Sequence, residues 1–351
     1  MTAVQPRSRA APMAMARVAT LPTLFVIVLV AATLFGSVEI PRTEVIQILL
    51  GKLGLYQTST SWPVGDQTIV WDIRLPEVLA AALVGCALGV AGALFQAVLR
   101  NPLADPYVIG TSAGAQLGVT CALILPWQVS VAAFGLLQVF AFAGAMGTVL
   151  VVYWLSRSAG KTPVVTLLLA GFVISSFLIS ATSLLMQIEG KIDQVTRWTL
   201  GGIQLDSPAQ LAVGAPIILL GSAVAFLLAP RLDLLLLGED QAGHLGVRVE
   251  LLKLVAVALA ALLTAVAVTL GGVIAFVGLV VPHTMRLLYG PRHRALIPAT
   301  AVGGGVFLML ADLVARVAIP PVPLPLGVVT AVIGAPFFLH LLKRTKREYA
   351  V

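Results

Sequence analysis

The sequence predicts an all-α integral membrane protein with about ten transmembrane helices. Hydrophobic residues make up 59% of the 351 residues and charged residues only 11%, whereas a soluble domain carries about 25% charged residues. The mean hydropathy is +1.02. The chain also offers about ten apolar runs of the length that a membrane-spanning helix needs, roughly 20 residues. A lipid bilayer is the solvent that suits this composition.

The predicted spans follow one another along nearly the whole chain. We expect a single transmembrane domain at 18–345, preceded by a cytoplasmic tail at 1–17 and followed by another at 346–351. The spans lie near residues 18–38, 76–99, 107–125, 130–155, 163–187, 209–229, 251–270, 273–289, 297–315 and 325–342.

The distribution of cations sets the orientation. Most of the 22 Lys and Arg residues fall on the side of the N-terminus when the spans are followed in order. The positive-inside rule therefore places both termini in the cytoplasm. The first apolar run follows Arg7, Arg9 and Arg17 without a convincing small-residue cleavage site, which favours an uncleaved anchor over a signal peptide. This topology explains the net charge of +7 without a nucleic-acid partner.

A polar segment at 37–74 indicates a long outward-facing loop, because it contains several glycines and a proline. The next helix is expected to begin at the RLPE segment, residues 74–77. Pro76 suits a first helical turn, and Glu77 suits the positive end of the helix dipole. The helix should end before the proline-containing turn at 100–106.

Small residues indicate close helix packing. Gly85, Gly89 and Gly92 fall on nearly one face of the predicted helix, which would let another helix approach closely in lipid. Residues 271–336 are rich in glycine and proline, which is typical of broken helices that line a pathway. Close packing without a pathway is the alternative.

A short amphipathic segment lies between two spans on the cytoplasmic side. Its sequence, LGEDQAGHLGV at 237–247, predicts a helix over about 238–247 with acidic residues in the first turn. Gly246 would end this helix, because glycine adopts the left-handed conformation at a C-terminal cap. A compact helix in this position could bind a partner protein.

Two short segments are similar to sequence motifs of enzymes. GTSAG at 110–114 fits G-x-S-x-G, and pairing Ser112 with His283 would make an intramembrane serine protease. No strand precedes the motif, so small residues that ease helix packing are the alternative. GKT at 160–162 is not a phosphate-binding loop, because Leu155 replaces its first glycine. We therefore expect no catalytic residue and no nucleotide site in this chain.

The remaining reactive side chains are sparse. Cys86 and Cys121 lie in apolar runs, so no disulfide is expected. The four histidines show no ligand spacing, so no metal site is expected either. Asp312 and His283 are the main ionisable residues within spans. An ion-coupled secondary transporter would depend on Asp312, although an ion relay usually has more such residues.

Several long segments resemble the FecCD-type permeases, the membrane subunits of type II ABC importers for haem, iron–siderophores and cobalamin. The resemblance covers roughly residues 70–345. It rests on RLPEVLAAALVGCALGVAGALFQAVLRNPLADPYVIGTSAGA (74–115), LLLAGF (167–172), WTLGG (198–202), LGEDQAGHLGV (237–247), AFVGLVVPHTMRLLYGPRHRALIP (275–298), ADLVAR (311–316) and LPLGVVTAVIGAPFFLHLL (324–342).

The resemblance implies the type II importer fold, with ten helices per subunit, in a homodimer. It also implies two cytoplasmic ATPase subunits, a periplasmic binding protein and a multi-pass location in the bacterial inner membrane. ATP and Mg²⁺ would be used by the partner ATPase, and no cofactor would be bound by this chain.

The resemblance also implies which residues couple the chain to the ATPase. The segment at 237–247 matches the family's coupling helix. The residues that would contact the ATPase are Glu239, Gln241, Ala242, His244, Leu245 and Gly246. The alternative is a solvated helix in a loop.

Further residues carry over by their motifs. Arg74 and Arg316 match outward-facing arginines that receive carboxylates of the binding protein, and directional Arg–carboxylate pairs suit such docking. The alternative is that each arginine anchors its own helix. Val164, Val165 and Thr166 match the start of the helix that lines the pathway and forms its cytoplasmic gate.

Two departures from the family pattern concern the outer face. Glu77 stands where the family commonly has a basic residue, and Pro323 stands where it commonly has an acidic one. The expected cargo is a large iron chelate, with haem first, siderophores second and cobalamin third. Few charges at the start of the pathway helix suit a bulky, mostly apolar cargo.

Overall fold

The computed structural model describes residues 10–55, 62–126, 130–131, 133–158, 160–203, 205–320 and 322–348, with side chains described between 20 and 340. Its elements are α1 (Ala10–Leu34), α2 (Arg42–Lys52), α3 (Val64–Gln67), η1 (Thr68–Arg74), α4 (Leu75–Val98), η2 (Pro106–Ile109), α5 (Thr111–Ile124), β1 (Ser130–Val131), β2 (Phe134–Gly135), α6 (Leu136–Ser156), α7 (Val164–Ile188), α8 (Ile192–Thr199), α9 (Ala209–Leu235), α10 (Glu239–His244), α11 (Val249–Gly271), α12 (Val277–Tyr289), α13 (His293–Val317) and α14 (Leu326–Glu348).

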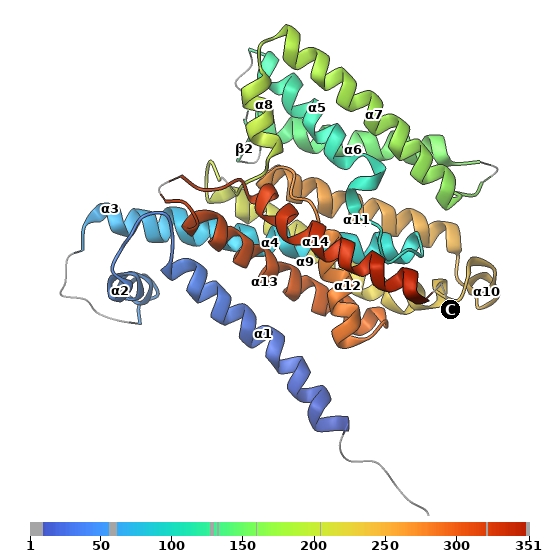
Figure 1. Ribbon diagram of the computed structural model, residues 1–351, viewed down its shortest axis with the longest axis horizontal. Coiled ribbons are helices and arrows are strands. Elements are labelled where there is room, and N and C mark those ends of the chain that lie inside the picture. Colours follow the sequence, from blue (N-terminus) through green and yellow to red (C-terminus); the bar gives the residue numbers. More distant parts are fainter. Residues whose placement is uncertain are drawn as a thin grey trace, which may run out of the picture.

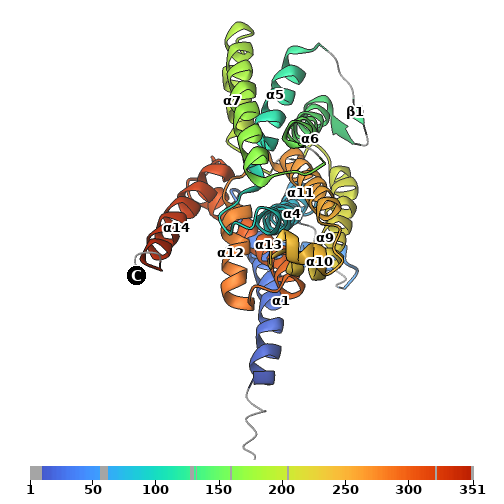
Figure 2. The same ribbon diagram turned by 90° about the vertical axis from the view of Figure 1, so that its right-hand side faces the viewer.

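Helix α4 forms the core of the molecule. It packs against α9, α11, α12 and α13, and 83% of its most apolar stretch is buried. A second group, α5, α6 and α7, packs together on the other side of α11 (Figures 1 and 2). The two short strands form a hairpin before α6, with Val131 paired to Phe134.

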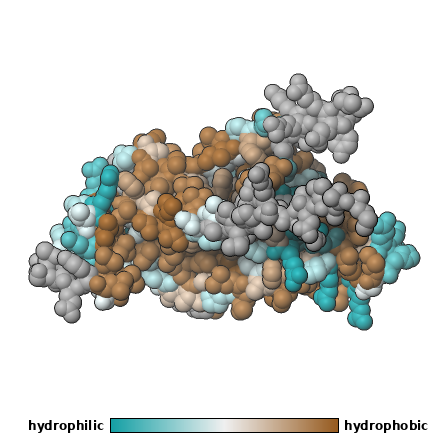
Figure 3. All heavy atoms as spheres, turned by 90° about the horizontal axis from the view of Figure 1, so that it is seen from below, coloured by the Kyte–Doolittle hydropathy of each residue, from teal (hydrophilic) through white to brown (hydrophobic). Residues whose placement is uncertain are grey.

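The surface matches a membrane protein. Apolar side chains gather across the middle of the face in Figure 3, with hydrophilic residues toward both ends. Among the described residues, six helices are long and apolar enough to span a bilayer, at 64–98, 136–156, 164–188, 209–235, 249–271 and 293–317. Shorter apolar helices lie at 20–34, 111–124 and 326–340.

Each predicted span overlaps one of these helices or α12. The number of spans and the cytoplasmic location of the termini stay predictions. Residues 1–9 and 349–351 of the predicted tails lie outside the described residues. The rest of each tail is largely helical, because α1 begins at Ala10 and α14 continues to Glu348.

The prediction of a loop at 37–74 was wrong for much of its length. Helix α2 lies within it, and α3 and η1 continue directly into α4 as one helix from residue 64. Pro76 therefore lies twelve residues after the start of this helix, at Val64. Proline lacks an N–H and clashes with the carbonyl four residues before it. The wider π-helical turn of η1, which precedes α4, accommodates this defect.

The prediction of close helix packing through glycine is confirmed. A Cβ atom at Gly85 of α4 would overlap the carbonyl oxygen of Gly304 on α13, and one at Gly92 would overlap that of Gly278 on α12. Backbones can approach this closely only where both partners lack a side chain. The helix ends as expected, with the Asn101 side chain accepting the Leu103 N–H at 2.9 Å in the following turn.

Candidate functional site

Helix α10 lies between α9 and α11, at the same end of the bundle as the C-terminus (Figure 1). Its first turn carries Glu239 and Asp240, which favour the positive end of a helix dipole. The Val247 N–H donates to the Ala242 carbonyl and the Gly246 N–H to the Gly243 carbonyl, both at 3.0 Å. Gly246 has a φ of +84°. This is a Schellman cap, so the predicted helix and its glycine stop are confirmed.

The residues predicted to contact an ATPase do not share one environment. Gln241, His244, Leu245 and Gly246 are exposed, and Leu245 is 59% exposed although it is apolar. Ala242 is fully buried within the chain, so its side chain is not open to a partner. The predicted contact role of all these residues stays a prediction, and the exposed ones form the face on which a partner could bind.

The Glu239 side chain is engaged within the chain. Its Oε2 atom lies 2.6 Å from Lys253 Nζ on α11, and its Oε1 atom lies 3.5 Å from Arg100 Nη2 at the end of α4. Lys253 is only 3% exposed and also contacts Glu250 Oε1 at 3.1 Å. The sequence analysis did not identify Lys253 or Glu250 as site residues. Their i,i+3 spacing at a helix start was the one available signal.

The predicted gate residues lie at the first turn of α7. Pro163 precedes Val164 as the N-terminal cap residue of the helix. Val165 is 67% exposed and Thr166 is exposed. Only 11% of the most apolar stretch of α7 is buried. This helix therefore presents a large apolar face away from the rest of the chain.

The turn between α4 and η2 carries a carboxyl group that titrates. Asp105 Oδ1 accepts the Tyr107 N–H at 2.9 Å and caps η2. Burial raises the pKa of Asp105 to about 6, although this hydrogen bond favours the ionised form.

The two predicted docking arginines are buried. Arg74 is 4% exposed and donates to the carbonyls of Thr33 and Val38 at 3.3 and 2.8 Å. Arg316 is 8% exposed and donates to the Ala32 carbonyl at 3.1 Å. Both therefore tie the end of α1 to their own helices, which is an internal role that differs from the alternative in which each arginine anchors only its own helix. Docking stays a prediction, and either side chain would leave these carbonyls to reach a partner's carboxylate.

Two acidic residues accompany these arginines. Arg316 Nη2 lies 2.8 Å from Asp312 Oδ2, one turn earlier on α13. Glu77 interacts electrostatically with Arg74, Asp312 and Arg316. The four side chains form a buried or half-buried cluster, which we call the outer charge cluster. Its formal charges sum to zero.

The geometry gives no support to the two alternatives left by the sequence, the intramembrane serine protease and the ion-coupled secondary transporter. Neither ring nitrogen of His283 has a hydrogen-bond partner among the described residues, and its ring packs edge-on to Phe337. Ser112 and His283 therefore do not form a nucleophile–base pair. Asp312 is ion-paired with Arg316 and is not a free intramembrane carboxylate.

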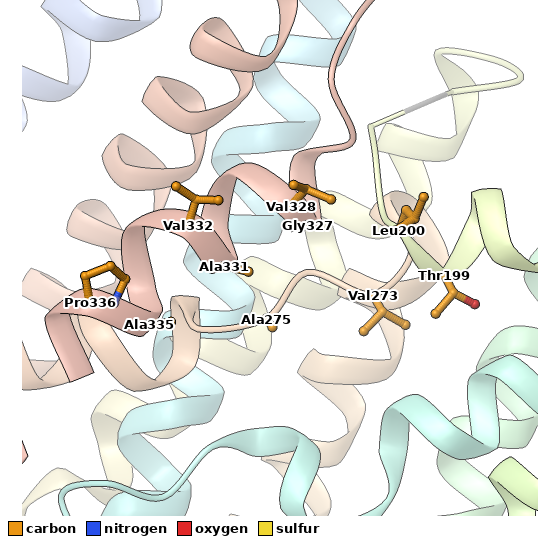
Figure 4. A pocket seen from close by; sticks show the side chains of 10 residues that line it. All are labelled: Thr199, Leu200, Val273, Ala275, Gly327, Val328, Ala331, Val332, Ala335 and Pro336. Atoms are coloured by element: carbon orange, nitrogen blue, oxygen red, sulfur yellow. The ribbon is translucent and has the colours of Figure 1, made fainter. Parts of the chain in front are cut away.

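An apolar groove runs beside α14. It has a volume of about 680 Å³. Figure 4 shows that α14 forms one side and that the segment between α11 and α12, with Val273 and Ala275, forms another. Its lining residues are Thr199, Leu200, Val273, Ala275, Gly327, Val328, Ala331, Val332, Ala335 and Pro336.

Comparison with known proteins places this geometry among transport subunits. A model of the FecCD transport family matches residues 24–344. The cobalamin import system permease protein BtuC of Halobacterium salinarum is 42% identical over 80% of this chain and 75% of its own length. The hemin transport system permease protein HmuU of Yersinia pestis is 37% identical over 82% of this chain and 88% of its own.

The fold has a solved counterpart. A structure described as an inward-facing conformation of a metal-chelate type ABC transporter matches with a TM-score of 0.78 and 28% sequence identity. The match covers 95% of this chain and 99% of that one.

Proposed function

The chain belongs to the FecCD transport family, and from this premise we propose that it is the membrane-spanning permease of an ATP-driven importer of a large metal chelate. The observation that carries the proposal is α10, a capped helix with an exposed face at one end of an apolar bundle. The chain is a transport subunit and not a catalyst. A separate ATPase subunit supplies the hydrolysis.

The partners follow from this role. We propose that two ATPase subunits bind the cytoplasmic end of a homodimer, with Gln241, His244 and Leu245 at the contact. A periplasmic binding protein would deliver the cargo at the opposite end, where α2 and α3 lie (Figure 1). The second copy would cover apolar surface of α7, of which little is buried within one chain.

The transport step is a change in access. ATP binding would draw the two ATPases together and move the α10 helices with them. A population shift between outward-open and inward-open states would then follow from the differential affinity of the ATPase for each state. Val164, Val165 and Thr166 at the start of α7 would form the cytoplasmic gate.

The apolar groove beside α14 supports a bulky cargo with little charge. Its lining in Figure 4 consists almost entirely of aliphatic side chains. A large ring system could move along such a surface without being bound tightly, because the lining offers few polar groups to hold it. We propose haem as the cargo.

Cobalamin is the second candidate. The identity of 42% to a cobalamin permease exceeds that of 37% to a hemin permease. Ferric siderophores belong to the same cargo class, and a ferric dicitrate permease, FecD of Escherichia coli, is also 37% identical.

Reconstitution tests the proposal. The chain would be placed in proteoliposomes with its partner ATPase and binding protein, and uptake of haem, cobalamin and a ferric siderophore would be measured separately. We expect haem uptake that requires ATP and both partners. Uptake that persists without ATP would refute the importer. Uptake of cobalamin in place of haem would correct the cargo alone.

A further inference from the structure

A buried ammonium group lies between the coupling helix α10 and the gate helix α7. Lys253 Nζ contacts three acceptors: Glu239 Oε2 at 2.6 Å, Glu250 Oε1 at 3.1 Å and the Thr162 carbonyl oxygen at 3.3 Å. A lysine ammonium has three N–H donors. Each acceptor comes from a different place in the sequence, so this one side chain joins α10, the start of α11 and the segment before α7.

Thr162, two residues before α7, has both its backbone N–H and its backbone carbonyl bound by the side chains of Glu250 and Lys253. The Thr162 carbonyl accepts from Lys253, and the Thr162 N–H donates to Glu250 Oε2 at 3.0 Å. Thr162 is 4% exposed and directly precedes Pro163, which caps α7. The Glu250–Lys253 pair therefore fixes where the first turn of α7 begins.

The contacts of Lys253 with Glu239, Glu250 and Thr162 resist separation of α10 from α7. A charge that is 3% exposed has almost no water to replace a lost partner, and an uncompensated buried charge is strongly unfavourable. Displacing α10 alone would remove the shortest contact of Lys253. The contact between Glu239 and Arg100 is weaker, because the Arg100 side chain is 43% exposed.

We propose that Lys253 is a positioning residue that makes α10 and the first turn of α7 move as one body, so that a shift of α10 moves the gate directly. This inference rests on the proposed function, since it takes α10 as the ATPase contact and α7 as the gate helix. It adds a specific route between them that passes through side chains of α11.

Lys253→Met tests the route, because it keeps the length of the side chain and removes the charge. Lys161→Met is the matched control, since Lys161 is an exposed lysine next to Thr162 and, among the described residues, its side chain makes no hydrogen bond to Glu239, Glu250 or Thr162. Both variants would be assembled with the ATPase and the binding protein in proteoliposomes. Wild-type import driven by ATP is the precondition, and its failure would defeat the proposed function instead.

The expected result is uncoupling. Lys253→Met should lower import by about tenfold or more while the ATPase still copurifies and hydrolyses ATP at close to the wild-type rate. Lys161→Met should import normally. Unchanged import in Lys253→Met would overturn the proposal. Loss of the ATPase from the complex would overturn it too, because Lys253 would then serve only the contact with the partner.

A distance measurement in a protein that keeps Lys253 decides the matter if Lys253→Met fails to fold. Spin labels would be attached at Asp240→Cys on α10 and Leu169→Cys on α7, both exposed, after replacement of Cys86 and Cys121 by alanine. The distance between the labels should be the same with and without ATP. A distance that changes with nucleotide would show that α10 moves independently of α7, and the proposal would be wrong.

Discussion

Removal of the Arg316 charge is the sharpest test of what holds the outer end of the molecule together. Arg316→Met keeps an unbranched apolar stem and removes the guanidinium. The change leaves the Asp312 carboxylate, with a side chain only 9% exposed, without its ion-pair partner. It also removes the donor to the Ala32 carbonyl at the end of α1.

The magnitude follows from the burial of the pair. Breaking a buried ion pair by removing one partner costs about 3–5 kcal/mol. With an entropy of unfolding of about 2.1 cal/mol/K per residue, that loss corresponds to a fall in melting temperature of roughly 4–7 °C for a chain of this length. The double variant Arg316→Met/Asp312→Leu removes both charges and should recover at least half of the fall, because no buried charge remains unpaired.

The chain carries its own reporter for this measurement. Cys86 and Cys121 are free and lie within α4 and α5, so a thiol-reactive fluorophore would report unfolding of the purified protein in detergent. A binding-protein titration would run beside it. If Arg316 serves only to dock the binding protein, Arg316→Met would leave the melting temperature unchanged and weaken binding alone. That result would refute the anchoring role.

Three further predictions use the same assay. Gly85→Leu should lower stability by about 3 kcal/mol or more, because its Cβ would overlap a backbone carbonyl. The control Gly147→Ala in α6, where the Cβ would meet open space, should raise stability by about 0.5–1 kcal/mol. Gly246→Ala should cost about 1–2 kcal/mol at its positive φ and weaken ATPase binding, whereas the control Gly243→Ala should not destabilise α10. The pKa of Asp105 is about 6 in the folded state, against an ordinary value of 3.8. Between these two pH values the folded state keeps a proton that the unfolded chain has lost, so stability should fall as pH rises through this range. Asp105→Asn should flatten this slope, and a slope of the opposite sign would contradict it.

The helices were predictable because their signal is carried by composition. A run of roughly 20 apolar residues has few other uses, and each predicted window overlaps a helix. The segment at 37–74 was misread because its composition is polar and contains glycine and proline. Its helices are stabilised by local packing of Ile40, Val45, Ile48 and Val70 in a small separate cluster. The segment has no periodic pattern of apolar residues long enough to predict these helices.

The candidate site was only partly predictable. Helix α10 and its cap are local features, so the acidic first turn and Gly246 identified them. The contacts of Lys253 are not local, because Thr162 and Glu239 lie 91 and 14 residues away in the sequence. Sequence reasoning counted Lys253 only as a cytoplasmic cation. The contact of Arg316 is non-local too, because its acceptor at Ala32 lies 284 residues away.

The outer charge cluster gives a physical meaning to Glu77, one of the two residues that depart from the family pattern. Two arginines and two acids sum to zero, so these four groups can be buried together. A basic residue at this position would leave three cations beside Asp312 alone. Such a cluster would favour an outward orientation of its arginines, toward an external carboxylate.

Glu77→Arg should therefore turn the outer charge cluster from a group of internal contacts into a surface that can bind the binding protein. We expect the melting temperature to fall further than in the control Glu77→Gln, because reversal of the charge adds repulsion to the loss of a partner. We also expect tighter and more salt-sensitive binding of the binding protein, since surface charge mainly steers association. If Glu77→Arg matched the wild type in both measurements, charge balance would not be what keeps Arg74 and Arg316 inside.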